Sequence, residues 1–204
     1  MTPQAPLSAG FADPVHDAQA AFRSVLDALA RPGRRFALGQ PVVGLVLGPA
    51  MAHLLLALTD DDTAVWWQQV DTARAGWLRF HTGAPTASAP ADAAFAVLTD
   101  AVAMPALDVF AAGSVASPER SATLLLEVPS LHQGPAVEWR GPGIQGIQTV
   151  RVGGLPNQFW SQWQSNHAAF PQGVDIVFTC AGEAIGLPRT TRVRRLEGVQ
   201  GCSS

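Results

Sequence analysis

The residues best suited to binding or catalytic chemistry lie between positions 170 and 191. Asp175 opens an apolar, β-branched run, and the segment closes with the motif Pro188-Arg189-Thr190-Thr191. A guanidinium flanked by two hydroxyls can hold a phosphate or carboxylate in a bidentate contact. The arginine can instead pair with an internal acid at a subunit contact, an alternative favoured because buried charges are nearly always paired. The candidates for an anion site or a structural ion pair are therefore Arg189, Thr190, Thr191 and Asp175.

A β-hairpin is expected to position these candidates. The turn at residues 171–173 leads into a strand over 174–179, and Gly182 turns the chain into a second apolar run that stops at Pro188. Asp175, Thr179 and the Arg-Thr-Thr motif then lie near strand ends, where sheets often present functional groups.

The clearest helix begins at Pro14, with Asp13 suited to cap it and proline suited to its first turn. Arg31-Pro32-Gly33 ends the helix. Its apolar residues have the spacing of one helical face. They are Val15, Ala18, Phe22, Val25, Leu26 and Leu29.

Further helices are expected over 49–58 and 156–167, with a shorter one over 107–112. The helix over 156–167 carries Phe159, Trp160 and Trp163 on one face, which favours burial in the core over an interface. Strands are expected at 35–38, 65–67, 93–98, 122–128, 137–140, 147–152 and 174–179. Because strict alternation of strand and helix breaks in the middle of the chain, the expected fold class is α/β, a three-layer sandwich with a mixed sheet.

Length and composition predict a single domain. The chain has 204 residues, of which 48% are hydrophobic and 14% are charged, enough to bury a sizeable core. We expect one α/β domain over residues 10–196, a disordered segment at 1–9 and a flexible tail at 197–204. The low charge content also predicts a buried subunit interface.

Charge and hydropathy argue against nucleic acid and membranes as partners. The net charge is −3, and the basic residues are mostly dispersed along the chain. The sequence has no signal-peptide pattern and no apolar run of about 18 residues, the length needed to span a bilayer. Cys180 and Cys202 have no disulfide-framework spacing. A cytoplasmic location is therefore expected.

All 13 lysine and arginine positions are arginines, so the chain contains no lysine. It contains no tyrosine either. Pyridoxal phosphate enzymes need a lysine amine for their internal aldimine, and a P-loop needs the lysine that follows its second glycine. Lysine bases and Schiff-base nucleophiles are likewise excluded.

Three other motifs are interpreted as structural. Gly141-Pro142-Gly143-Ile144-Gln145-Gly146 matches G-x-G-x-x-G, but an alternating run follows it where a dinucleotide site needs a helix. A turn between two strands is therefore favoured over a phosphate cradle. Residues 60–62 are three aspartates that suit a solvated loop better than a metal site, and the five histidines have no zinc-site spacing. No catalytic residue, cofactor or metal is assigned.

The order and spacing of several motifs resemble the PhnH family, the H protein of the bacterial carbon-phosphorus lyase system. The resemblance runs from about residue 10 to residue 194. Its motifs are Asp13-Pro14-Val15-His16-Asp17-Ala18-Gln19 with Phe22-Arg23 and Pro32-Gly33, then Leu78-Arg79-Phe80-His81-Thr82, Gly141-Pro142-Gly143-Ile144, and the segment 170–191.

The resemblance implies a role in using phosphonates as a phosphorus source. In this family the H protein belongs to a core complex with the G, I and J proteins. With G, I and L it supports the reaction of methylphosphonate with ATP that yields ribose 1-methylphosphonate 5-triphosphate. The resemblance implies an accessory subunit, without evident cofactor, that dimerises and looks like a reduced pyridoxal phosphate transferase fold. The alternative is a subunit that carries its own nucleotide or phosphonate-binding site.

Overall fold

A mixed six-stranded sheet organises the protein in a computed structural model that describes residues 10–39 and 47–196. Across the sheet the order is β1 (Phe36–Ala37), β8 (Glu183–Leu187), β7 (Asp175–Cys180), β4 (Thr123–Glu127), β3 (Phe95–Leu98) and β2 (Val65–Trp67). Strands β2, β3, β4 and β7 are parallel, whereas β8 is antiparallel to both β7 and β1. The predicted α/β class with a mixed sheet is confirmed, as is the β7–β8 hairpin.

The central strands β4 and β7 are buried on both faces. In β4, Leu124 and Leu126 belong to one apolar cluster and Leu125 to another. In β7, Phe178 and Val177 divide between the same two clusters. An unbroken apolar run is typical of a parallel strand covered on both sides. The two clusters therefore lie on opposite faces of the sheet.

Three helices cover one face: α1 (Pro14–Ala30), α2 (Pro49–Leu58) and α3 (Thr72–Thr82). Asp13 caps α1 by accepting hydrogen bonds from the backbone N–H groups of Val15 and His16, as predicted. Asp71 caps α3 in the same way. Gly83, in the left-handed region with φ of 83°, ends α3.

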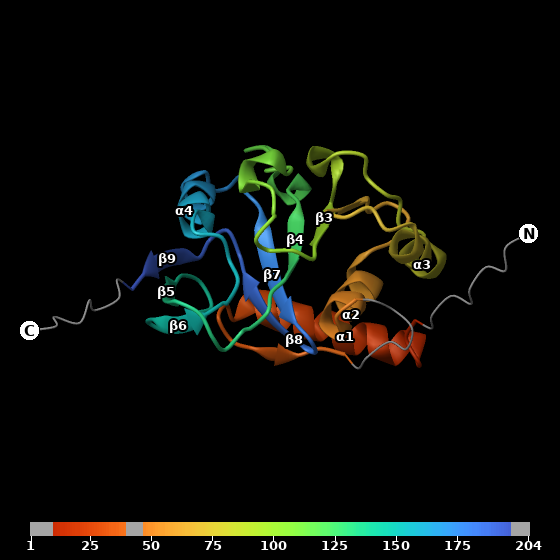
Figure 1. The fold of residues 1–204 in the computed structure, drawn as a ribbon, viewed down its shortest axis with the longest axis horizontal. Coiled ribbons are helices and arrows are strands. Elements are labelled where there is room, and N and C mark those ends of the chain that lie inside the picture. Colours follow the sequence, from red (N-terminus) through yellow and green to blue (C-terminus); the bar gives the residue numbers. More distant parts are fainter. Residues whose placement is uncertain (1–9, 40–46, 197–204) are drawn as a thin grey trace, which may run out of the picture.

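The opposite face carries a small antiparallel sheet and the helix α4 (Phe159–Ala168). The small sheet has the order β6 (Gln148–Arg151), β5 (Ala136–Arg140), β9 (Arg192–Arg195). Figure 1 shows it beside α4, at the end of the molecule away from α3. Phe159, Trp160 and Trp163 are all buried, which confirms their predicted place in the core.

Several sequence predictions need correction. The expected helix over 107–112 is only the 3-10 turn Leu107–Val109, because Ala112 leaves it to pair with Ser121 in an isolated β-bridge. Helix α3 and strand β9 were not predicted. The glycine motif at 141–146 joins β5 to β6, which confirms a strand-to-strand turn. The expectations for 1–9 and 197–204 lie outside the described residues, and the single domain over 10–196 stays a prediction.

The predicted apolar face of α1 is wrong for three of its six residues. Val25 is buried, but Val15, Phe22 and Leu26 are exposed. The remaining buried residues of α1 are the small side chains Ala21 and Ala28. Small side chains allow α1 to lie close to β8, and this contact turns the larger apolar residues outward.

The contact between α1 and β8 depends on Gly186. A Cβ atom at this position would lie 2.4 Å from the backbone oxygen of Ala28. We expect Gly186→Ala to lower the free energy of unfolding by about 2 kcal/mol, the usual cost of overpacking. Urea denaturation measures this change. The control is Gly76→Ala in α3, where a Cβ atom would have no atom of the described residues within 4 Å and better helix propensity should stabilise by about 0.8 kcal/mol. Equal effects of the two variants would contradict the steric argument.

Candidate functional site

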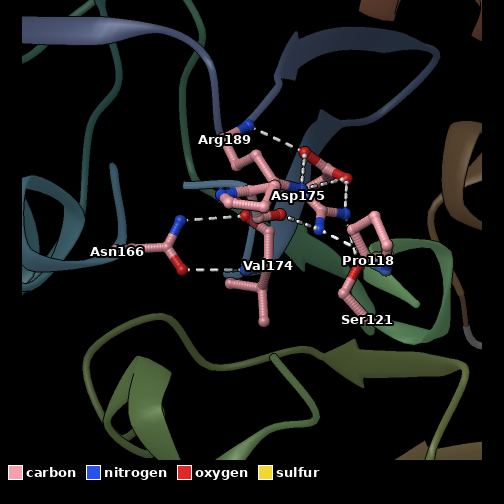
Figure 2. A network of polar contacts seen from close by, with 7 residues as sticks. Pro118, Ser121, Asn166, Val174, Asp175 and Arg189 are labelled. Atoms are coloured by element: carbon pink, nitrogen blue, oxygen red, sulfur yellow. Dashed lines mark hydrogen bonds and ion pairs between the residues drawn. The ribbon is translucent and has the colours of Figure 1, made fainter. Parts of the chain in front are cut away.

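Arg189 lies in a closed network at the start of β7 (Figure 2). Its backbone N–H donates to Asp175 Oδ1 at 2.7 Å, and its Nε lies 3.2 Å from both oxygens of the same carboxylate. One terminal nitrogen donates to the carbonyls of Pro118 and Pro171 at 3.1 and 3.3 Å. The other donates to Ser121 Oγ and Asp175 Oδ2. The guanidinium has five N–H groups, and these contacts occupy all of them.

Because all its guanidinium N–H groups are used, Arg189 acts as a link between segments of the protein. The side chains of Arg189 and Asp175 are only 13% and 21% exposed. The arginine joins the 118–121 turn, the 170–173 segment, β7 and the β8–β9 connection. With every donor used, it has none left for an outside anion unless the network opens.

The other sequence candidates do not gather around Arg189. Thr191 is fully buried, and its carbonyl accepts a hydrogen bond from Trp163 Nε1 at 2.9 Å. Thr190 is half-buried and lines a separate cavity beside β9. Thr179 lies at the opposite end of β7, in register with Glu127. The hairpin therefore separates these side chains, although they are close in sequence.

A larger cavity lies at the carboxyl ends of β2, β3 and β4, where open parallel sheets usually bind ligands. Its volume is about 780 Å³. We call it the strand-end cavity. Its polar side chains are Gln69, Arg74, Thr99, Asp100 and Glu127.

The loop after β3 is held in place beside this cavity by Gln68. Gln68 Oε1 accepts from the backbone N–H groups of Thr99 and Asp100 at 3.0 and 2.9 Å. Its Nε2 donates to the carbonyl of Asp100 at 2.8 Å. Asp100 Oδ1 then accepts from Val102 and Ala103 N–H. The loop presents Thr99 and Asp100 to the cavity in a fixed geometry.

Arg74 and Glu127 are two of the three charged residues that line the strand-end cavity within the ranges that the structure describes, and Asp100 is the third. Arg74 Nε lies 3.1 Å from Asp71 Oδ2 as an ion pair, but this nitrogen is buried and makes no hydrogen bond within the described part of the chain. Its terminal nitrogens donate no hydrogen bond to any residue in the described part of the chain. Glu127 Oε1 packs against Gly48, where a Cβ atom would lie 2.7 Å from it. Burial raises the pKa of Glu127, and the nearby Arg74 guanidinium partly offsets that rise.

This arrangement suits a small polar ligand. Arg74 can donate to an anionic group, and Glu127 can accept a proton or a hydrogen bond a short distance away. The carboxylates of Asp71, Asp100 and Glu127 outnumber the one guanidinium. A ligand that combines an anionic group with hydroxyl or amino groups therefore fits better than a polyanion.

The buried carboxyl of Glu127 predicts a pH-dependent stability. Its pKa is raised above the ordinary value of 4.5, so the folded protein holds this proton more tightly than the unfolded chain. The stability that this proton contributes is fully present below about pH 4.5 and is lost as pH rises through the folded-state pKa. The amide of a Glu127→Gln variant has no such proton to lose. Thermal unfolding should show this variant equal to wild type near about pH 4 and more stable than it at about pH 8. A difference that stays constant with pH would contradict this explanation.

Sequence reasoning missed Arg74 and Glu127 as residues of the strand-end cavity. Arg74 lies on the unpredicted helix α3. Glu127 follows the apolar run Leu124-Leu125-Leu126, and an acid at the carboxyl end of a buried parallel strand was a usable signal.

No group of three or more histidine, cysteine or acidic side chains within residues 10–39 and 47–196 could hold a metal ion. Over the same ranges, no helix is long and apolar enough to cross a bilayer.

Comparison with known proteins confirms the resemblance seen in the sequence. A family model described as "Bacterial phosphonate metabolism protein (PhnH)" matches residues 9–194. Over 201 residues the chain is 39% identical to the alpha-D-ribose 1-methylphosphonate 5-triphosphate synthase subunit PhnH of Rhizobium meliloti (strain 1021), covering 96% of the chain and all of the relative. Over 179 residues it is 34% identical to HtxG of Stutzerimonas stutzeri, named as a proposed C-P lyase subunit, covering 86% of the chain and 85% of the relative. The chain therefore belongs to the PhnH family of bacterial phosphonate metabolism proteins.

Proposed function

We propose that this chain is an accessory subunit of a cytoplasmic carbon-phosphorus lyase complex, required to form ribose 1-methylphosphonate 5-triphosphate from ATP and methylphosphonate. The observation that carries the proposal is the 39% identity to a subunit of that synthase over the relative's full length. In this role the chain associates with the G, I and J proteins, and it forms a homodimer when isolated. Its fold is a reduced relative of the pyridoxal phosphate transferases.

The geometry of Arg189 supports an accessory role. The Arg189–Asp175 cluster joins four chain segments to one another, and all the N–H groups of its guanidinium donate to oxygen atoms of the protein. Such a cluster stabilises a scaffold. The exposed apolar residues of α1, which are Val15, Phe22 and Leu26, support an interface with another subunit.

Co-purification tests the subunit role. A tagged chain should retain the G, I and J proteins when all four are co-expressed, and light scattering should give a dimer for the chain alone. Failure of every partner to associate, with the chain folded, would overturn the proposal.

The strand-end cavity favours a second function, in which the chain binds a small ligand of its own. The specific observation is that Arg74 and Glu127 face one cavity at the carboxyl end of the sheet. Product formation by reconstituted complexes distinguishes the two functions. Complexes with Arg74→Gln or Glu127→Gln should keep wild-type activity if the subunit is only accessory. A loss of activity in an intact complex would support the ligand-binding function.

A further inference from the structure

The solvent-facing side of the small sheet has an uneven distribution of charge. In the register of β5 and β9, Glu138 lies opposite Arg194, and Arg140 lies opposite Arg192. The first pair is an ion pair at 2.7 Å. The second brings two cations together on neighbouring strands. Like charges placed directly opposite each other destabilise a sheet.

No carboxylate in the described ranges compensates Arg140 or Arg192 by an ion pair. Arg140 makes no side-chain hydrogen bond to a described residue either. Arg192 uses its Nε, which donates to His167 Nε2 at 3.3 Å. The repulsion between these two guanidiniums is therefore not offset within the described protein, and an external anion would offset it.

A cavity of about 720 Å³ opens beside the two arginines. We call it the arginine pocket. Its polar and aromatic side chains are Arg140, His167, Phe170, Thr190 and Arg192. Among the residues that the structure describes, no aspartate or glutamate lines this pocket. Phe170 is 57% exposed and gives the pocket an aromatic edge.

His167 fixes the direction of Arg192. His167 Nδ1 lies 2.8 Å from the carbonyl of Arg189, which can only accept, so Nδ1 carries the hydrogen. The other ring nitrogen is then the acceptor for Arg192 Nε. The terminal nitrogens of Arg192 donate to no residue in the described ranges, so they can donate to a ligand.

We propose that the arginine pocket binds a phosphate or phosphonate group. Arg140 and Arg192 donate to its oxygens from two neighbouring strands, and the hydroxyl of Thr190 supplies a neutral donor. The group can belong to a free small anion or to a nucleotide whose base stacks on Phe170. This inference goes beyond the proposed subunit role, because binding is a property of the chain alone.

Calorimetry of the isolated chain at low salt tests the proposal, with inorganic phosphate, methylphosphonate and ATP as probes. We expect binding of at least one probe, weakened by at least about tenfold in Arg140→Gln and in Arg192→Gln. Arg194→Gln, on the same face, and Arg74→Gln, in the strand-end cavity, are controls and should bind as wild type. The proposal is overturned if no probe binds to folded protein, or if the control variants lose affinity equally.

The three probes identify the source of the group. If ATP binds more tightly than phosphate and Phe170→Ala removes that gain, the ligand is a nucleotide. Equal affinities, unchanged by Phe170→Ala, indicate a free anion. Both results support a site for a phosphate or phosphonate group in the arginine pocket. They do not depend on whether the chain co-purifies with the G, I and J proteins.

Thermal unfolding gives an independent measurement. Without added anion, Arg140→Gln should raise the melting temperature, because it removes the like-charge contact with Arg192. Added phosphate should raise the melting temperature of wild type but not that of this variant. A variant that melts lower than wild type without anion would contradict the proposed repulsion.

Discussion

Asp175→Asn is expected to lower the free energy of unfolding by about 3 kcal/mol, a large part of the stability of a domain of this size. The variant keeps the shape of the side chain and removes its charge. Arg189, only 13% exposed, would then remain without a counter-charge. Breaking one side of such a pair is costly because the remaining charge is desolvated and unpaired.

The same substitution loosens more than one contact. Arg189 also donates to Pro118 and Pro171 carbonyls and to Ser121 Oγ. Without the carboxylate, the guanidinium gains free energy by moving into water, and it then loses its hydrogen bonds to these acceptors. We therefore expect both the 118–121 turn and the 170–173 segment to exchange amide hydrogens faster in the variant.

Two further variants separate the charge from the packing. Arg194→Gln removes an ion pair whose arginine is 70% exposed, and it should cost under about 1 kcal/mol. Combining Asp175→Asn with Arg189→Met should recover part of the loss, since it leaves no buried charge. Urea denaturation of the four proteins measures these differences. An Asp175→Asn cost no larger than that of Arg194→Gln would show that solvent already screens the Arg189 pair.

Local sequence signals predicted the elements that depend on local chemistry. The Asp13 cap, the helix over 49–58 and the hairpin that holds Asp175 and Arg189 follow from capping, proline placement and turn residues. Each signal lies within a few residues of the structure that it specifies. Such features need no knowledge of the packed protein.

Features that depend on packing between distant segments were not predicted. Val15, Phe22 and Leu26 of α1 were wrongly expected on its buried face. The close contact of this helix with β8 is made at Gly186, more than a hundred residues away in sequence. The strand-end cavity combines Arg74 with Glu127 from separate elements. The arginine pocket depends on the register of β5 with β9. Neither register nor cavity can be read from a single segment.

Trp163→Ala is expected to cost about 4 kcal/mol, the second large effect. The side chain is fully buried in the cluster that contains Trp139 of the small sheet and Phe178 of β7. Its removal leaves a cavity that neighbouring rigid strands can fill only in part. Denaturant unfolding measures the loss, and Phe170→Ala, at an exposed aromatic residue, should cost under about 1 kcal/mol. Similar losses in the two variants would contradict the cavity argument.

Trp163→Phe tests what the indole N–H contributes beyond packing. This group donates to the carbonyl of Thr191 at 2.9 Å, and Thr191 stands between Thr190 and Arg192 of the arginine pocket. We expect a cost of about 1 to 2 kcal/mol, from lost volume and an unpaired buried carbonyl. If the hydrogen bond also fixes the connection into β9, the folded variant should bind phosphate more weakly than wild type. Unchanged phosphate binding in this variant would mean that the register of β5 with β9 alone positions the two arginines.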